Sequence, residues 1–171
     1  MLTEEKQQEI VNNLFKKPTE EICWNCSEYV TVTLAPYLDI PREQLEILQK
    51  TATIFGYGMG DSAGPCGILS GLILLLGYCK GRLDAADADA KTLCYQLGKE
   101  LKENIIALKD QIPEEFKPAG GFWRQPDQQM TCRRIRIPEE EFSGIEAPDA
   151  YCRVFMDMAI QAFAPIASKL K

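Results

Sequence analysis

The sequence contains no histidine among its 171 residues, although it contains seven cysteines. This absence excludes a Ser-His-Asp triad, a Cys-His protease pair and a zinc site with histidine ligands. It also excludes a c-type haem attachment site, which requires Cys-x-x-Cys-His, so we expect no haem. General acid or base chemistry near neutral pH would therefore depend on carboxylates, lysines or thiols.

Positive charge is also scarce, with 19 basic against 25 acidic residues and a net charge of −6. A nucleic-acid-binding protein would show a basic stripe, so we expect no nucleic-acid partner. The sequence has no P-loop, no dinucleotide-binding glycine motif after a strand and no paired-carboxylate pattern. We therefore predict no nucleotide cofactor. Nothing identifies an organic substrate, and whether the protein is an enzyme stays open.

Long hydrophobic segments are missing as well. The longest uncharged apolar run, CGILSGLILLLGYC from Cys66 to Cys79, has 14 residues, whereas a membrane-spanning helix needs about 20. We expect a buried central helix there and no membrane insertion. The start, MLTEEKQQEI, lacks the features of a secretory signal. This predicts a cytoplasmic, reducing location, where disulfides do not explain seven cysteines.

Sustained period-two alternation is absent, and helical periodicity runs through most of the chain. The sequence predicts one all-α domain over residues 1–171, a bundle of about five to six helices around the buried apolar helix. We expect an irregular segment near 111–147, which contains prolines at 113, 118, 126 and 138. Pro165 is expected to disturb the last helix. The expected helices are 3–17, 19–34, 41–55, 66–79, 84–109 and 148–169.

Cys23 and Cys26 form a CxxC motif, which in thioredoxin-like proteins follows a strand. No strand is predicted before it, so two thiols on one buried helical face are the favoured interpretation. The role of Cys23 stays open.

Cys66 follows a glycine-rich segment and Pro65, which places it at a helix N-terminus. The partial positive charge there predicts a lowered thiol pKa. Gly67 and Gly71 are spaced for close approach of a second backbone. Alternatively, the two glycines are packing notches without chemistry.

Cys132 and Cys152 lie near arginines, with residues 122–136 carrying a net charge of +3 and Arg153 following Cys152. Such charge would stabilise a thiolate or a negatively charged cluster. The alternative is a solvated basic loop that pairs with the glutamates at 139–141. Cys79 and Cys94 are expected to be core residues.

Three sequence elements resemble the C_GCAxxG_C_C family of redox-active proteins: Asn25-Cys26-Ser27-Glu28, Phe55-Gly56-Tyr57-Gly58-Met59-Gly60 and Cys66-Gly67-Ile68-Leu69-Ser70-Gly71. The resemblance implies a helical fold and a site built from Cys26, Cys66, Cys132 and Cys152. Gly58, Gly60, Gly67 and Gly71 would shape this site. Ile68 and Tyr57 replace smaller family residues, which places bulkier groups near it.

Three functions remain open. The first is a thiolate-bound metal centre on the four cysteines, most simply an iron–sulfur cluster, serving electron transfer or redox sensing with a partner protein. The ligand spacings of 40, 66 and 20 residues differ from the close pairs of structural zinc sites. The second is metal-free thiol–disulfide chemistry, with Cys66 attacking and Cys26, Cys132 or Cys152 resolving. The third is a helical assembly module, in which the apolar helix and its glycines form a homodimer interface.

Overall fold

The computed structural model describes residues 2–13, 24–61, 63–111, 129–136 and 149–171. In this part of the chain every regular element is helical, and the only β-type pairing is an isolated bridge between Pro65 and Thr131. The predicted all-α fold is therefore confirmed. The elements are α1 (Glu4–Asn13), α2 (Cys26–Leu34), η1 (Ala35–Leu38), α3 (Arg42–Ala52), η2 (Thr53–Phe55), α4 (Gly56–Met59), α5 (Gly67–Lys80), α6 (Ala88–Lys109), α7 (Cys132–Arg136) and α8 (Asp149–Ala167).

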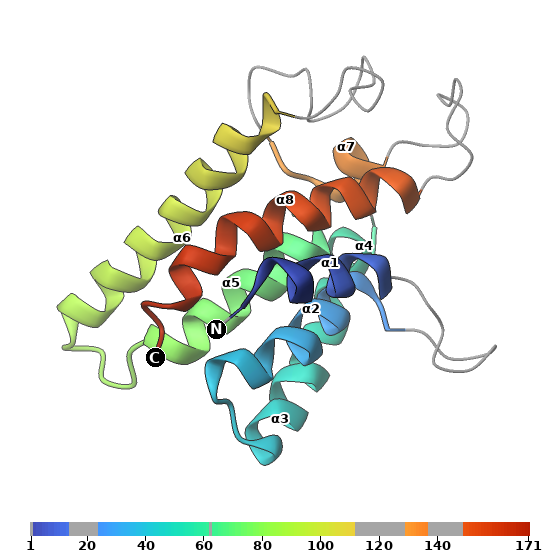
Figure 1. Ribbon diagram of the computed structural model, residues 1–171. Coiled ribbons are helices and arrows are strands. Elements are labelled where there is room, and N and C mark those ends of the chain that lie inside the picture. The colour runs from blue at the N-terminus through green and yellow to red at the C-terminus, as the bar shows by residue number, and fades with distance from the viewer. Residues whose placement is uncertain (1, 14–23, 62, 112–128, 137–148) are drawn as a thin grey trace.

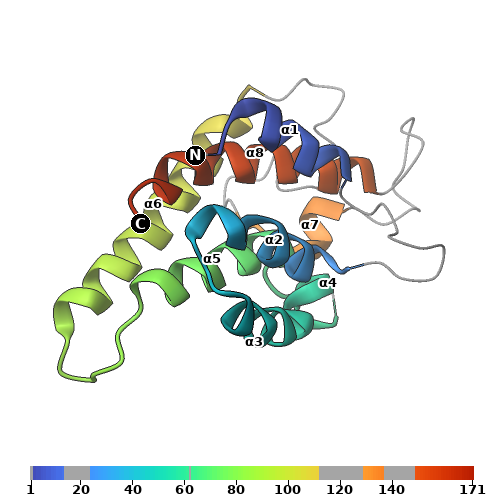
Figure 2. The same ribbon diagram turned by 60° about the horizontal axis from the view of Figure 1, so that its bottom comes forward.

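Helix α5 is the centre of the bundle, as its apolar sequence predicts. It contacts α2, α3, α4, α6 and α8. Both views place it between the α6–α8 pair and the α2–α3 pair (Figures 1 and 2). Its fully buried side chains are Ile68, Leu72 and Leu75. Within the described residues, no helix combines the length and apolar character needed to cross a membrane.

Four helices begin at the same end of the bundle. The N-terminal ends of α2, α5, α7 and α8 lie together on the right-hand side of Figures 1 and 2, next to α4. Contacts of α2 with α5, of α4 with α5 and α7, and of α7 with α8 connect this end. The carbonyl-rich C-terminal end of α5 lies far from it, beside the start of α6.

Several predicted boundaries need correction. Trp24 and Asn25 are not helical, so α2 begins at Cys26 and not near Thr19. Its N-cap is Asn25, whose side chain binds the first backbone N–H groups. The predicted continuation of the first helix to Lys17 lies outside the described residues.

The long helix α6 begins at Ala88 and not at residue 84, because the Asp87 side chain caps it by accepting from the Ala90 N–H (2.8 Å). Within the segment predicted to be irregular, residues 132–136 form α7. Helix α8 continues through Pro165 to Ala167. Its core residues Phe155, Ile160 and Phe163 are fully buried.

Candidate functional site

Cys26 is the first residue of α2, and its place is fixed by a capping box. The Asn25 side-chain oxygen accepts from the backbone N–H groups of Ser27 and Glu28 (3.0 Å each). In return, the Glu28 carboxylate accepts from the Asn25 N–H (2.9 Å). The Asn25 amide also donates to the Thr53 carbonyl (3.0 Å), which ties the start of α2 to η2. Cys26 is therefore held at a rigid helix start.

Cys66 and Cys132 are brought together by the isolated bridge. The Cys66 N–H donates to the Met130 carbonyl (2.8 Å), and the Cys132 N–H donates to the Gly64 carbonyl (3.0 Å). Both cysteines are neighbours of the bridged pair Pro65 and Thr131. Because side chains alternate across a β-type pairing, Cys66 and Cys132 fall on the same side of it. Cys66 is also the N-cap of α5, and Cys132 begins α7.

Two glycines allow the backbone to approach these cysteines. A Cβ at Gly67 would overlap the Cys26 Sγ and would lie 2.9 Å from the Phe55 carbonyl oxygen. A Cβ at Gly58 would lie 2.8 Å from the Cys132 Cβ, and Gly58 has a φ of 62°. Only glycine fits these two positions without a shift of the neighbouring chain.

The other two glycines expected at the site lie elsewhere. A Cβ at Gly60 would meet nothing within 4 Å. Gly71 packs against α2, where a Cβ would lie 2.9 Å from the Ser27 carbonyl oxygen and 3.2 Å from the Val30 Cγ1. The close approach predicted at Gly67 and Gly71 therefore exists, and its partner is α2 of the same chain.

Burial dominates the electrostatics of the cysteines. Cys66, Cys132 and Cys152 are buried, while Cys26 is half-buried. Burial raises the pKa of the Cys66 thiol well above its usual value, and the charges of Cys26, Cys152 and Cys132 raise this pKa further. These three sulfurs therefore lie within electrostatic reach of Cys66, and the fold brings the four cysteines to one region.

The prediction of a lowered pKa at Cys66 is wrong. The backbone N–H of Ile68, in the first turn of α5, does act in the predicted direction on this pKa. Loss of hydration outweighs this contribution, because the Cys66 side chain is only 3% exposed. A position at a helix N-terminus thus lowers a thiol pKa only where water still reaches the sulfur.

Cys26 receives more help from the backbone than Cys66 does. Burial raises the pKa of its thiol, and hydrogen bonds from the backbone N–H groups of Tyr57, Ser27, Cys26 itself and Gly67 oppose this increase. These donors come from the starts of α2, α4 and α5. The Cys26 sulfur is therefore the place where three elements direct N–H groups at one atom.

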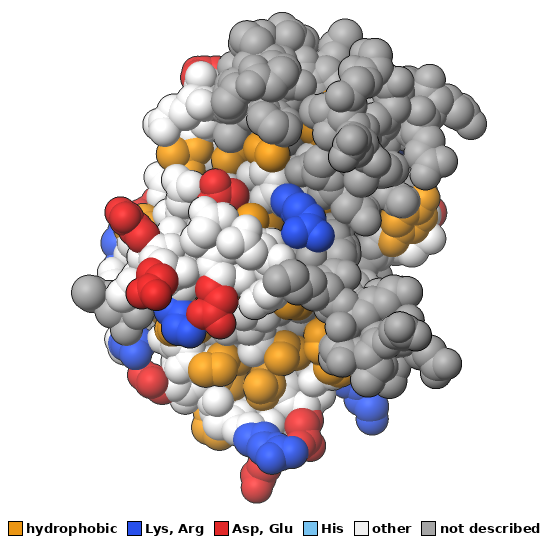
Figure 3. All heavy atoms as spheres, turned by 45° about the vertical axis from the view of Figure 1, so that its right-hand side comes forward, with side chains coloured by type: hydrophobic (Ala, Val, Ile, Leu, Met, Phe, Trp, Pro, Cys, Tyr) orange, Lys and Arg blue, Asp and Glu red, His pale blue; other side chains and the backbone are white. Residues whose placement is uncertain are grey.

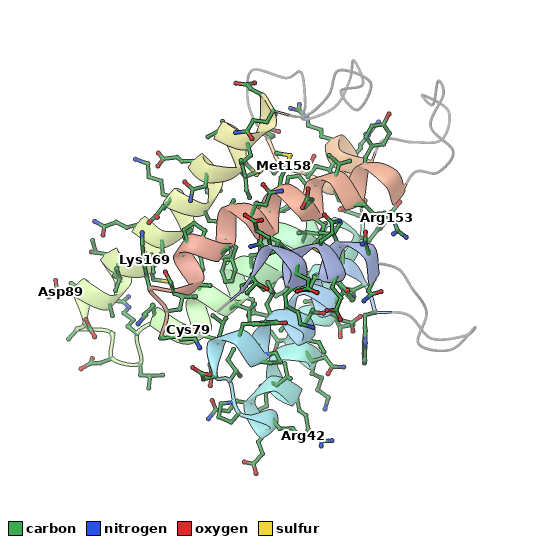
Figure 4. All side chains as sticks on the ribbon, in the orientation of Figure 1. Arg42, Cys79, Asp89, Arg153, Met158 and Lys169 are labelled. Atoms are coloured by element: carbon green, nitrogen blue, oxygen red, sulfur yellow. The ribbon has the colours of Figure 1, made fainter. Side chains whose placement is uncertain are left out.

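Cysteines outside the cluster take ordinary positions. Cys79 lies at the opposite end of α5, where Figure 4 labels it, and burial raises the pKa of its thiol. Cys94 on α6 is half-buried, as is Cys79. Cys23 lies outside the described residues.

The expected arginines do not form a described contact with the cluster. Arg153, labelled in Figure 4 beside the start of α8, donates to the Asn12 carbonyl of α1 (3.5 Å). Arg133 is exposed, and Arg124 lies outside the described residues. The nearest positive partial charges to Cys26 are therefore backbone N–H groups.

The donor set suits a soft metal ion, because it consists of thiols without imidazole. Among the described residues, however, no three Cys, Asp or Glu side chains are grouped closely enough to hold one ion directly. Ligation at the four cysteines would therefore require their side chains to turn towards a common centre.

An open apolar groove of about 480 Å³ runs along the outer side of α5, between α3 and α4. Its lining residues are Leu48, Phe55, Met59, Pro65, Ser70, Ile73, Leu74, Gly77 and Tyr78. Pro65 borders Cys66 in the sequence, so one end of the groove adjoins the cysteine region. Figure 3, which turns the end with the helix starts forward, also shows hydrophobic side chains gathered in its lower half.

Sequence comparison connects this geometry to a family. The model of one protein family, described as "Putative redox-active protein (C_GCAxxG_C_C)", matches residues 24–166. The chain belongs to the C_GCAxxG_C_C family. The match covers all four clustered cysteines and the glycines at 58 and 67, and the family's description names redox activity. Comparisons with curated proteins and with solved structures gave no match.

Asn25, Gly56 and Gly64 are site residues that motif reasoning from the cysteines did not identify. Asn25 with Glu28 follows the capping-box pattern of a capping residue and an acid three positions later, so this sequence signal was present. Gly64 acts through its backbone, accepting from Cys132 and donating to the Gly58 carbonyl (3.1 Å). Its pairing joins segments that are 68 residues apart, which no local pattern indicates.

Proposed function

We propose that Cys26, Cys66, Cys132 and Cys152 together hold a thiolate-bound metal centre, with an iron–sulfur cluster as the first candidate, for electron transfer or redox sensing. One observation carries this proposal. Each of the four cysteines caps or lies in the first turn of a helix, and these helices begin at the same end of the bundle. The same end carries the close approaches at Gly58 and Gly67.

The physical argument concerns negative charge. Four neighbouring thiols with little access to water resist ionisation, because each thiolate would be poorly hydrated and would repel the next. The N–H groups at the helix starts favour the opposite, since they stabilise an anion. A soft cation bound by thiolates resolves this conflict, because it neutralises the charges that burial disfavours.

The chain's residues would hold the centre, and an iron–sulfur cluster would supply one-electron exchange when bound. The backbone N–H groups around Cys26 would donate to its sulfur, which is one of the factors that set the potential of such a centre. The buried environment of Cys66 would exclude water from the ligands.

Anaerobic reconstitution with iron and sulfide tests the proposal. We expect bound iron and sulfide, visible absorption, and a rise in the melting temperature, because ligand binding to the folded state stabilises it. Single serine variants at each of the four cysteines should lose most of the bound iron. Cys79→Ser and Cys94→Ser are matched controls and should retain it. Reconstituted protein without iron, sulfide or visible absorption would contradict the proposal.

A metal-free disulfide function has one supporting observation. Of the three cysteines that act on Cys66, Cys26 has the strongest charge effect, so these two sulfurs form the first candidate pair. Mild oxidation followed by mass spectrometry distinguishes the two functions. A reproducible, reducible Cys26–Cys66 disulfide in protein that takes up no metal would favour thiol–disulfide chemistry.

The assembly hypothesis loses part of its basis, because α2 fills the glycine notch of α5. A homodimer and a redox partner protein remain predictions. Sedimentation of the purified protein addresses the former.

A further inference from the structure

The short turn α4 carries backbone strain that its side chains do not explain. Tyr57 has φ 51° and ψ 42°, and Met59 has φ 64°. The left-handed region is unfavourable for residues other than glycine, and such strain persists only where the surroundings determine it. The Tyr57 side chain is 48% exposed, so burial of the ring does not hold it in this conformation.

The backbone of Tyr57 does have a role in the site. Its N–H forms a hydrogen bond with the Cys26 sulfur, opposite the N–H of Gly67. With a right-handed conformation at residue 57, the turn would follow another path and the chain after it would leave Cys132.

Contacts on both sides hold the turn in place. Gly56 packs against the Asn25 side chain so closely that a Cβ would overlap it. On the other side, the Gly64 N–H donates to the Gly58 carbonyl (3.1 Å), and Gly58 packs against Cys132. The turn is therefore clamped between the residue before Cys26 and the first residue of α7.

We propose that Tyr57 is a positioning residue of the cysteine site, whose left-handed backbone holds its N–H on the Cys26 sulfur and presents this sulfur as an anion. Cys26 is consequently the most reactive of the four thiols in the metal-free protein. The part of this inference that concerns a bound centre rests on the proposed function. The part that concerns thiol reactivity does not.

Alkylation of metal-free, reduced protein with iodoacetamide tests the inference. The Cys26 sulfur attacks the methylene carbon, a thioether forms and iodide leaves, and peptide mass spectrometry assigns a rate to each cysteine. In the wild-type protein we expect Cys26 to react before Cys66, Cys132 and Cys152. A slower reaction of Cys26 than of Cys66 would overturn the inference.

Substitutions at residue 57 separate the backbone from the side chain. Valine is β-branched and is strongly disfavoured in the left-handed region, whereas asparagine and glycine adopt it readily. We expect Tyr57→Val to slow Cys26 alkylation about tenfold, the effect of losing a hydrogen bond to a charged group. Tyr57→Asn and Tyr57→Gly should stay within about twofold of wild type. Equal rates in all three variants, or faster alkylation in Tyr57→Val, would contradict a positioning role.

Two controls keep the result interpretable. The alkylation rates of Cys79 and Cys94, which lie outside the site, report on the overall fold and should not change. The NMR signal of the residue 57 amide proton should move on Cys26→Ser substitution even if Tyr57→Val does not fold, and an unchanged signal would overturn the inference. In protein reconstituted with iron, Tyr57→Val should lower the reduction potential, because N–H donors to the ligand sulfur stabilise the reduced, more negative centre. If no metal binds but Cys26 reacts first as described, the proposed function fails and the positioning role stands.

Discussion

Single atoms decide how the cysteine region is built. The hydrogen atom in place of a side chain at Gly67 allows α5 to touch both Cys26 and the Phe55 carbonyl. At Gly58, the same economy allows the turn to approach Cys132. These two glycines act as spacers between the elements that carry the cysteines.

Gly67→Ala should destabilise the protein by about 1–3 kcal/mol, because the added methyl group collides with a fixed carbonyl as well as with a sulfur. Urea unfolding of the metal-free protein measures this cost. Gly98→Ala is the matched control, since Gly98 on α6 has open space where its Cβ would lie. That variant should gain about 0.5–1 kcal/mol from helix propensity. Similar losses in both variants would contradict the packing described here.

Burial of Cys66 predicts a pH dependence of stability. Its thiol pKa is raised in the folded protein, so the unfolded chain releases this proton at a lower pH, near the ordinary thiol pKa of about 8.5. The contribution is constant below that pH, and stability decreases as the pH rises from there towards the folded-state pKa. Unfolding free energies of metal-free protein from pH 7 to 10 measure the decrease. Cys66→Ala should give a shallower slope than wild type, and parallel curves would refute the assignment.

The start of α2 is the element on which the site depends most directly. Its capping box places Cys26 at the first helical position, and the bond from Asn25 to Thr53 ties that helix end to the turn next to it. A helix start held from two sides leaves its first residue little freedom. This is where local helix stability and the position of a sulfur become the same property.

Asn25→Ala should cost about 1–2 kcal/mol, since it removes the helix cap and the bond to the Thr53 carbonyl together. Asn25→Ser retains a capping oxygen and loses only the bond to Thr53, so its cost should be smaller. Thermal unfolding of both variants gives the comparison. An equal cost for the two would show that the cap itself contributes nothing.

Helix content was predictable because it depends on local pattern. The apolar periodicity of α5 and the amphipathic pattern of α6 were sufficient to place these helices. The boundary of α2 was missed because Cys23 and Cys26 share a helical spacing, which suggested an earlier start than the Asn25 cap allows. Helix α7 was missed because five residues give too short a pattern to stand out among prolines.

At the scale of the molecule, α5 connects the two halves of the bundle. The residues along it alternate between complete burial and exposure to the apolar groove, as the neighbours Leu72 and Ile73 illustrate. Its first turn belongs to the cysteine region, while the rest of it belongs to the core. Core stability and site geometry are therefore coupled through one helix.

Leu72→Ala should destabilise the protein by about 2–5 kcal/mol, as expected for a fully buried leucine. Ile73→Ala, one residue further along, should cost about 1 kcal/mol, because the Ile73 side chain is 41% exposed. Urea titrations of both variants provide the test. A larger loss for Ile73→Ala would mean that the groove is filled in solution.

The grouping of the four cysteines was predictable only through the family resemblance. Periodicity placed Cys66 at a helix start, but no local signal joins it to Cys132, which lies 66 residues later. The raised pKa of Cys66 was missed for the same reason: burial results from elements that lie far apart in the sequence. Chemistry at a helix start can be inferred locally, whereas its hydration cannot.

The isolated bridge between Pro65 and Thr131 also has a consequence for how the protein folds. Cys26 and Cys66 belong to the compact succession from α2 to α5, whose contacts close over short lengths of chain. Cys132 and Cys152 join them only after a much longer loop has closed, and longer loops close at a greater entropic cost. During folding the cysteine region should therefore be completed in two stages, with a pair of thiols waiting for the second pair.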